Sequence, residues 1–297
     1  MMPCKYLYAF IYGFMHALTS LDYKKIFKFI NKKCKGNKMK KELCVVSMSG
    51  GLDSSTLCAK ALSEGKTVLP VNFNYGQKNV VEMTAQQNVW NHYKDQYKDQ
   101  LLDTIVIDLT SVIGDTISIF QKNRDNGKAY SSTGMTYYMP SRNLLFMALS
   151  AVIGEIIAND EDITDLSLGL GIHQHSDIYA KDYWDISPEF AEKLGELLSL
   201  NDNVNVTIYA PYANGFKSKI VDDVVRLKVP YKKTWTCYNP TLLNTYHKQG
   251  DDELTQQYVP CMRCEACLER ASQADKSELF TNGDINDYMT EVGKIDL

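Results

Sequence analysis

The chain has 297 residues, of which 44% are hydrophobic and 23% are charged, with 17 Gly and 8 Pro. These proportions are ordinary for a globular protein, and they exclude collagen-like, low-complexity and intrinsically disordered classes. The formal net charge is −4, so the overall balance does not require a nucleic-acid partner.

The first 38 residues form a basic extension with a net charge of +7, since they hold eight Lys and one Asp. The whole chain is −4, which leaves −11 on residues 39–297. Residues 6–21 are uncharged and mostly apolar, but they are too short for the ~20 residues of a spanning helix and lack the basic start of a signal peptide. Residues 21–33 have the spacing of an amphipathic helix. The extension is interpreted as an accessory segment that packs on the body, or as sequence upstream of a start at Met39. The alternative is a helix that contacts a membrane surface or a partner.

The body of the chain alternates predicted strands and helices. Short apolar runs with β-branched residues predict strands, and 3.6-residue periodicity predicts helices. The predicted strands are 43–48, 66–73, 103–108, 163–172 and 205–209, and the predicted helices are 57–63, 79–93, 141–158 and 216–228. This order predicts an α/β fold, a doubly wound parallel sheet with helices on both faces. Residues 110–138 are predicted to form a long functional loop, and the region after about Val229 has no strand pattern.

A loop of glycines and hydroxyl residues follows the first predicted strand: Ser49-Gly50-Gly51-Leu52-Asp53-Ser54-Ser55-Thr56. The two glycines let backbone N–H groups approach an anion closely. The helix that follows adds its partial positive charge. The loop lacks the Gly-Lys-Ser/Thr ending of a Walker A motif, yet its position predicts a phosphate-binding site. Asp53 would orient this loop or help to hold Mg²⁺.

The eight cysteines fall into two groups. Four are scattered, and two of these, Cys44 and Cys58, lie in apolar stretches and are predicted to be small buried residues. The other four are Cys237, Cys261, Cys264 and Cys267. Their tight spacing is unsuited to independent disulfides and typical of a structural Zn²⁺ site with four thiolates. An Fe–S cluster or free thiols are the alternatives. This cysteine usage favours a reducing compartment, and we expect a cytoplasmic location.

The segment Ser49-Gly50-Gly51-Leu52-Asp53-Ser54 resembles the pyrophosphate loop of the ATP pyrophosphatase group. That group includes asparagine synthetase, GMP synthetase, NAD synthetase and tRNA lysidine synthetase. Its members cleave ATP between the α- and β-phosphates and adenylate an oxygen of the substrate, and a nucleophile then displaces AMP. The resemblance implies an adenine nucleotide alpha hydrolase-like fold.

Later motifs narrow the resemblance to the 7-cyano-7-deazaguanine synthase family of queuosine biosynthesis, over about residues 43–275. In chain order these motifs are Asn74-Tyr75-Gly76-Gln77, Met139-Pro140-Ser141-Arg142-Asn143, Gly171-Ile172-His173, the segment from Tyr183 to Phe190, Ala210-Pro211-Tyr212 before Lys217, and Thr236-Cys237-Tyr238-Asn239 before the Cys triplet. The right order of so many motifs makes the resemblance specific.

The resemblance implies an ATP-dependent carbon–nitrogen ligase that converts 7-carboxy-7-deazaguanine and ammonia to 7-cyano-7-deazaguanine through adenylated intermediates. The expected cofactors are ATP, Mg²⁺ and Zn²⁺. The implied catalytic residues are Asp53, Ser54, Lys217 and Arg142. The implied nucleotide site comprises Met48, Ser49, Gly50, Gly51, Leu52, Asp53, Ser54, Ser55, Thr56, Tyr75 and Gln77. The implied substrate residues are Arg142, Asn143, Asp177, Tyr183 and Asp185. His173 and His175 also follow a strand end, but are interpreted as structural.

One segment departs from the family pattern, because Tyr-Pro-Asp-Cys-Arg is replaced by Tyr183-Trp184-Asp185-Ile186-Ser187. This departure leaves two alternatives open, a relative that stops at the amide and one that transfers the activated deazaguanine to another amine. A third alternative is a zinc-ribbon RNA-binding protein with an inactive nucleotide fold, against which the acidic body and the intact loop argue.

The expected organisation has three parts: a basic extension over residues 1–38, a nucleotide-binding α/β domain over 39–228 and a zinc-binding region over 229–297. We expect small-molecule substrates and a homodimer. No stable nucleic-acid binding is expected, because the body is acidic.

Overall fold

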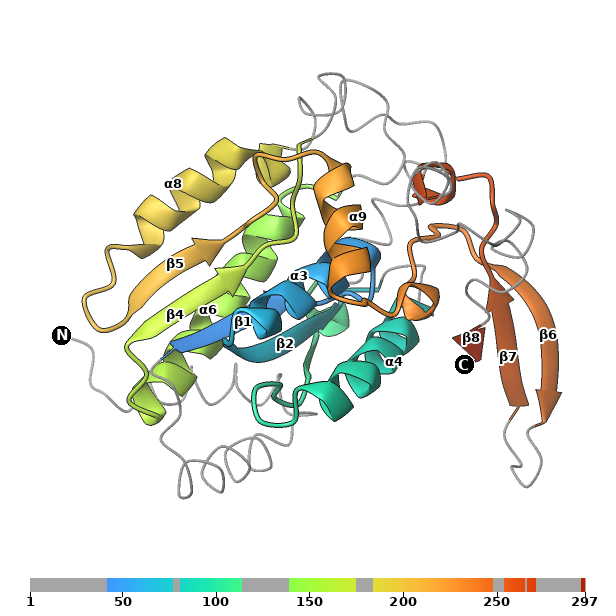
Figure 1. Cartoon of the computed structure of the whole chain (residues 1–297), viewed down its shortest axis with the longest axis horizontal. Coiled ribbons are helices and arrows are strands. Elements are labelled where there is room, and N and C mark those ends of the chain that lie inside the picture. Colours follow the sequence, from blue (N-terminus) through green and yellow to red (C-terminus); the bar gives the residue numbers. More distant parts are fainter. Residues whose placement is uncertain are drawn as a thin grey trace.

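A computed structural model describes residues 42–76, 81–113, 139–174, 184–247, 254–264, 266–270 and 295–296. The basic extension, residues 114–138 of the predicted loop, and the predicted site residues Gln77, Asp177 and Tyr183 lie outside the described residues. The described part holds a large sheet flanked by helices and a small sheet beside it (Figure 1).

The large sheet is parallel throughout and has the strand order β3-β2-β1-β4-β5. Its strands are β1 (Glu42–Ser47), β2 (Thr67–Asn74), β3 (Ile105–Asp108), β4 (Asp165–Gly169) and β5 (Asn205–Tyr209). This arrangement confirms the predicted doubly wound α/β fold. The strand order reverses between β1 and β4, and sheets of this kind bind their ligands at the carboxyl ends of the strands beside such a reversal.

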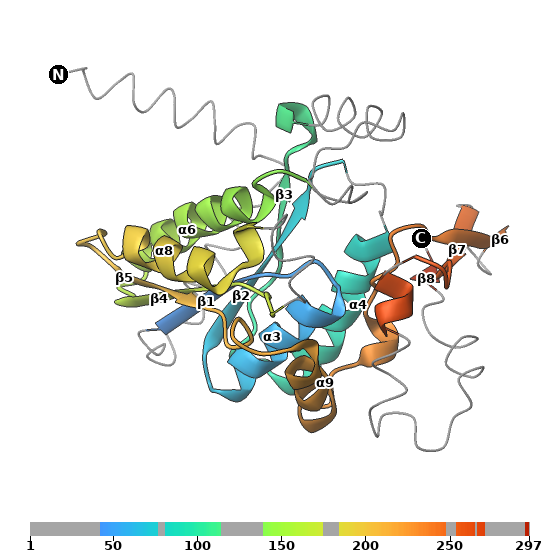
Figure 2. The same ribbon diagram turned by 90° about the horizontal axis from the view of Figure 1, so that it is seen from above.

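Helices cover both faces of the large sheet (Figure 2). On one face lie α3 (Leu52–Ser63), α4 (Val81–Gln96) and α9 (Lys217–Arg226), and on the other lie α6 (Arg142–Asp160) and α8 (Pro188–Leu198). Strand β1 explains the two layers, since Leu43 and Val45 pack into one core and Cys44 and Val46 into the other. All four are fully buried, as expected for a parallel strand covered on both faces.

The buried cysteines and α6 follow the sequence-based predictions. Cys44 and Cys58 are both fully buried, and burial raises the pKa of Cys44 to about 12. Helix α6 is the one helix among the described residues that is long and apolar enough to span a membrane. Its residues Phe146 and Met147 pack in the core of the large sheet, so its composition is that of a core helix.

Helix α8 was not predicted, although its start carries a clear signal. Ser187 accepts a hydrogen bond from the Phe190 N–H at 3.0 Å, and Pro188 occupies the first position of the helix. A Ser N-cap followed by Pro is a typical helix start. A short 3₁₀ turn, Trp184–Ile186, precedes it. The segment that departs from the family pattern therefore leads into α8.

The prediction that no strand follows Val229 is wrong. After a 3₁₀ turn at Tyr231–Lys233, β6 (Thr241–His247), β7 (Leu254–Val259) and β8 (Ile295–Asp296) form an antiparallel sheet in that order. Residues 241–245 of β6 are all exposed. The two apolar ones, Leu242 and Leu243, are adjacent, so the strand lacks the alternation of apolar and polar residues by which a half-buried strand is recognised.

Candidate active site and metal centre

The predicted phosphate loop connects β1 to α3 and packs directly on α4. Gly50 has φ +93°, and a Cβ there would lie 2.5 Å from the backbone nitrogen of Gln86 and 2.5 Å from the backbone oxygen of Glu82. Only glycine fits this conformation and this close approach. The N-cap of α3 is Gly51, which has no side chain to cap the helix. The first N–H groups of α3 are therefore those that an anion would bind.

The side chains of Ser49 and Ser54 close this loop on itself. The N–H of Ser49 donates to Ser54 Oγ at 3.2 Å, and the N–H of Gly51 donates to Ser49 Oγ at 3.2 Å. The loop after β4 supports the same turn, because the position of a Cβ on Gly171 would lie 3.5 Å from Ser54 Cα. The loop is thus shaped before any ligand binds.

The other loop residues that were predicted to bind nucleotide have buried side chains. Met48, Leu52, Ser55 and Thr56 are at most 2% exposed. Thr56 Oγ1 donates to the carbonyl of Leu52 at 2.7 Å. These side chains serve packing, and contacts with a nucleotide would come from their backbone groups.

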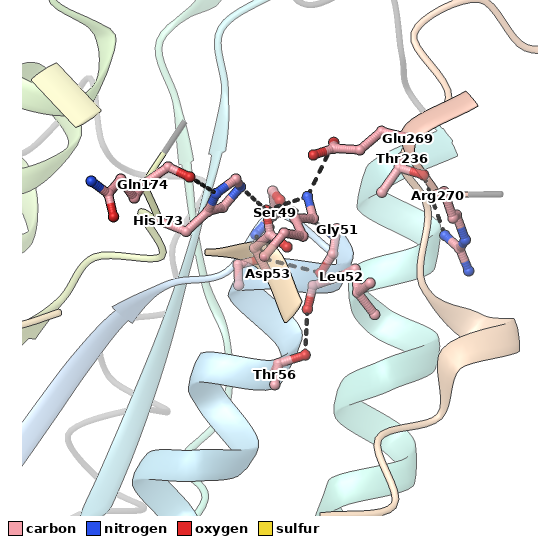
Figure 3. A network of polar contacts seen from close by, with 12 residues as sticks. Ser49, Gly51, Leu52, Asp53, Thr56, His173, Gln174, Thr236, Glu269 and Arg270 are labelled. Atoms are coloured by element: carbon pink, nitrogen blue, oxygen red, sulfur yellow. Dashed lines mark hydrogen bonds and ion pairs between the residues drawn. The ribbon is translucent and has the colours of Figure 1, made fainter. Parts of the chain in front are cut away.

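Three segments bring polar side chains to the phosphate loop. Lys217, the first residue of α9, places its Nζ 3.0 Å from Asp53 Oδ2 and 3.3 Å from Glu269 Oε2. His173, beyond the end of β4, has its Nε2 3.7 Å from the same Asp53 oxygen. Figure 3 shows His173 and Glu269 on opposite sides of Asp53. The sheet order explains this meeting, because the loops after β1, β4 and β5 share one edge.

The charge on Lys217 is held by its two carboxylate partners. Burial disfavours that charge, but the negative charges of Asp53 and Glu269 outweigh it, so the pKa of Lys217 is raised. Asp53 Oδ1 is buried without a hydrogen-bond partner among the described residues. A buried carboxylate oxygen of this kind is costly unless a donor or cation meets it. Asp53 therefore fits the predicted role in holding Mg²⁺.

Glu269 is the residue that sequence reasoning missed, whereas His173 was named from its motif and interpreted as structural. His173 is 5% exposed and lies two residues beyond Gly171. Its place just after a strand end at the sheet reversal was the available signal. Glu269 follows Cys267 by two residues and had no signal, since a single Glu beside a Cys motif is typical of a solvated surface.

Arg142 and Tyr75 form a second polar pair at the strand ends. Arg142, the first residue of α6, makes a side-chain hydrogen bond with Tyr75, which follows β2. Burial raises the pKa of Tyr75, and the charge of Arg142 lowers it in part. The Tyr75 ring packs on Phe146, with 5.5 Å between ring centroids. The two predicted site residues are thus brought together.

Asn143 and Asp185 bind one another. The N–H of Asn143 donates to Asp185 Oδ2 at 2.9 Å, and Asn143 Nδ2 donates to the Asp185 carbonyl at 3.1 Å. Asp185 is 2% exposed, and its carboxylate meets the positive end of α6. Asp185 thereby holds the start of the helix that carries Arg142. Direct contact of this pair with a substrate stays a prediction.

The four C-terminal cysteines form one cluster. The Sγ atoms of Cys237, Cys261, Cys264 and Cys267 all lie within 4.8 Å of one another. Four thiolates on a tetrahedral Zn²⁺ stand about 3.8 Å apart, given a Zn–S bond of about 2.3 Å. The cluster is therefore suited to bind a metal.

Backbone groups support negative charge on Cys237. The pKa of Cys237 is lowered, first by a hydrogen bond from Cys267 and then by backbone N–H groups. These are the N–H groups of Cys261 and Asn239, at 3.2 and 3.4 Å from Cys237 Sγ. A thiol whose pKa is lowered in this way is a ready metal ligand.

The segment that leads into the cysteine cluster is hydrogen-bonded to the phosphate loop. The N–H of Trp235 donates to the Gly50 carbonyl at 2.9 Å, and Trp235 Nε1 donates to the Cys237 carbonyl at 3.0 Å. Arg270 is 7% exposed and donates to the carbonyls of Thr234 and Tyr231 at 3.0 and 2.7 Å. The cysteine cluster and the phosphate loop are therefore neighbours.

Comparisons with known proteins identify the family of this chain. The family model described as queuosine biosynthesis protein QueC matches residues 43–277. A 7-cyano-7-deazaguanine synthase from Prochlorococcus marinus (strain NATL1A) is 28% identical over 234 residues, covering 77% of this chain and 91% of the relative. Another, from Picrophilus torridus, is 29% identical over 254 residues, covering 84% of this chain and 93% of the relative.

A solved structure is also similar, at a lower sequence identity. It is the crystal structure of a 4-thiouridine synthetase–RNA complex with bound ATP, with a TM-score of 0.36 and 18% identity, covering 63% of this chain and 41% of that chain. The family match spans most of the chain and includes the phosphate loop, the sheet reversal and the four cysteines. The chain therefore belongs to the queuosine biosynthesis protein QueC family, a family of enzymes.

Proposed function

We propose that this protein converts 7-carboxy-7-deazaguanine and ammonia to 7-cyano-7-deazaguanine with two molecules of ATP. The observation that carries the proposal is the pair of Lys217 and Asp53, 3.0 Å apart, at the phosphate loop beside the sheet reversal. Membership of a family whose relatives are named 7-cyano-7-deazaguanine synthase supports the choice of substrate.

In the first half of the reaction, a carboxylate oxygen attacks the α-phosphate of ATP and pyrophosphate leaves. Ammonia then displaces AMP and loses a proton, which gives the amide. In the second half, the amide oxygen attacks another ATP, the nitrogen loses a proton and pyrophosphate leaves. Loss of AMP and the last N–H proton forms the nitrile.

The residues contribute positioning and charge stabilisation rather than covalent chemistry. The first N–H groups of α3 and the Lys217 ammonium stabilise negative charge as pyrophosphate departs. Arg142 binds the substrate carboxylate. Asp53 would hold Mg²⁺, which neutralises pyrophosphate when bound. The four cysteines would hold a structural Zn²⁺, since four thiolates leave no open ligand position.

Mass spectrometry of the product tests this function. Purified protein is incubated with ATP, an ammonium salt and 7-carboxy-7-deazaguanine, and AMP and pyrophosphate are measured in parallel. We expect the nitrile with two AMP for each product molecule. No AMP formation with this substrate contradicts the proposal.

The altered segment 183–187 supports a second candidate, in which the activated deazaguanine stops at the amide or passes to another amine. Ser187 caps α8 in this chain, so an arginine at that position is not available to hold a substrate. One AMP for each amide molecule, or a mass that includes a different amine, favours this candidate. Cytoplasmic location and a homodimer remain part of the proposal.

A further inference from the structure

Glu269 comes from the cysteine region and reaches the phosphate loop. Its Oε2 lies 3.3 Å from Lys217 Nζ, while Asp53 contacts the same ammonium at 3.0 Å. The Lys217 side chain is 13% exposed and that of Glu269 is 43% exposed. Lys217 therefore holds two carboxylates from segments far apart in the chain.

Two partners constrain a lysine in a way that one does not. The Lys217 ammonium is the end of a flexible four-carbon chain and carries three N–H donors. With Asp53 alone, the group rotates about that single contact. With Glu269 as a second anchor, the remaining N–H keeps one direction, as a preorganised charge must to stabilise a transition state.

Glu269 is itself placed by fixed neighbours in sequence. Cys267, two residues before it, is 4% exposed and belongs to the cysteine cluster. The N–H of Leu268 donates to the Cys264 carbonyl at 3.0 Å. Arg270, one residue after it, is held by the carbonyls of Tyr231 and Thr234. The backbone on both sides of Glu269 is thus anchored.

We propose that Glu269 is a positioning residue for Lys217. Its carboxylate holds the ammonium at the phosphate loop, so that the C-terminal cysteine region completes the active site as well as stabilising itself. The kinetic consequence rests on the proposed function, whereas the contact itself does not.

The contact is tested by chemical labelling, which needs no substrate. Acetic anhydride acylates accessible lysines, and peptide mass spectrometry measures the labelling rate of Lys217 in wild type and Glu269→Gln. We expect a severalfold increase at Lys217. Glu196→Gln is the matched control, because it removes a carboxylate–lysine pair with Lys193 at 3.0 Å on the solvent-facing side of α8 and leaves Lys217 labelling unchanged. Equal Lys217 labelling in wild type and Glu269→Gln overturns the proposal.

The positioning role is tested by a split between kcat and KM. We expect kcat to fall about tenfold in Glu269→Ala and less in Glu269→Gln, whose amide oxygen still accepts an N–H. The KM for ATP should not rise, because the Glu269 carboxylate repels the phosphates of ATP and its removal does not weaken their binding. Glu269→Gln is isosteric, so its metal content and melting temperature should stay at wild-type values. If Glu269→Ala fails to fold, the kcat of Glu269→Gln decides whether Glu269 has the positioning role. Unchanged kcat in folded, metal-loaded Glu269→Ala, or a raised kcat, overturns the role. If wild type forms no AMP with 7-carboxy-7-deazaguanine, the proposed function fails, while the labelling result still decides the contact.

Discussion

The large sheet and the C-terminal cysteine region are stabilised by different means. Strand β1 lies between two apolar cores, and each of its buried residues contacts one of them. The cysteine region has a small core around Val81, Ala85 and Trp235 together with two of the cysteines, and the described side chains of β6 are exposed. The first region is stabilised by buried apolar area. The second has a smaller apolar core, a few buried hydrogen bonds and a cluster of cysteines that is suited to bind a metal. The proposed active site lies where these two kinds of structure meet.

The largest effect on activity is expected from Asp53→Ala, because Asp53 lies in the phosphate loop, where the large sheet meets the cysteine region. Lys217 and His173 lose their shared partner, while the hydrogen bonds of Ser49 and Gly51 keep the loop shaped. We expect AMP formation to fall by at least about a hundredfold, with melting temperature close to wild type. Asp202→Ala, in an exposed loop, is the control. Turnover at the wild-type rate in Asp53→Ala would remove the loop from the mechanism.

Gly50→Ala tests the stability of the large-sheet region. The added Cβ would lie 2.5 Å from two backbone atoms of α4 at a φ of +93°, so stability should fall by about 3 kcal/mol. Gly76→Ala is the matched control, because φ is +78° and the nearest atom is Thr110 Cγ2 at 4.0 Å. There the loss should be about 1 kcal/mol. Chemical denaturation measures both, and equal losses would contradict the close approach to α4.

Cys264→Ala tests what stabilises the C-terminal cysteine region. Wild-type protein should contain one Zn²⁺ per chain, and the variant should lose it, since ligand loss and folding of a metal-held region are coupled. The melting temperature should drop by about 5 °C or more. A metal-free variant of wild-type stability would contradict the structural role.

Hydrogen exchange sharpens the same comparison. After treatment with a chelator, amides in 234–247 and 254–264 should exchange faster, because the thiol cluster joins these segments. Amides of β1 and β4 should keep their protection, because their stability comes from the apolar cores. Equal loss of protection in both regions would show that the sheet also depends on the metal.

The smallest effect is expected from removal of the basic extension. A chain starting at Met39 keeps β1 and the whole phosphate loop, so folding and ATP-dependent activity should match the full-length protein. If only the full-length protein binds anionic vesicles, and does so in a salt-sensitive way, the extension is a membrane-surface helix. An insoluble or inactive truncated protein would assign residues 1–38 to the core.

The fold could be predicted where burial leaves a repeating pattern. Strand β5 matches its predicted range, and β1 differs by one residue at each end. For β1 the reason is burial on both faces, which gives a short apolar run. Strand β6 could not be found, because its Leu242 and Leu243 are adjacent and exposed. Helix α8 carried a Ser-Pro start that was interpreted only as part of a substrate motif.

The residues of the candidate site could be named from the sequence, but the contacts between them could not. Asp53 and Lys217 were each identified from motifs, yet their pairing follows from the neighbouring positions of β1, β4 and β5, which no local pattern encodes. Glu269 depends on how the cysteine region folds back, so its contact with Lys217 required the three-dimensional structure. The cysteine cluster was predictable because three of its four members, Cys261, Cys264 and Cys267, are close in sequence.

The hydrogen bond from Trp235 to the Gly50 carbonyl has a consequence for synthesis on the ribosome. The phosphate loop is translated early, but the segment that holds its carbonyl emerges after all five strands of the large sheet. Domains begin to fold as they leave the ribosome, so a nascent chain with a complete sheet still has an unfinished loop. Release of the C-terminal segment then gives the enzyme its competent site, and a chain truncated before Trp235 should be folded in part and inactive.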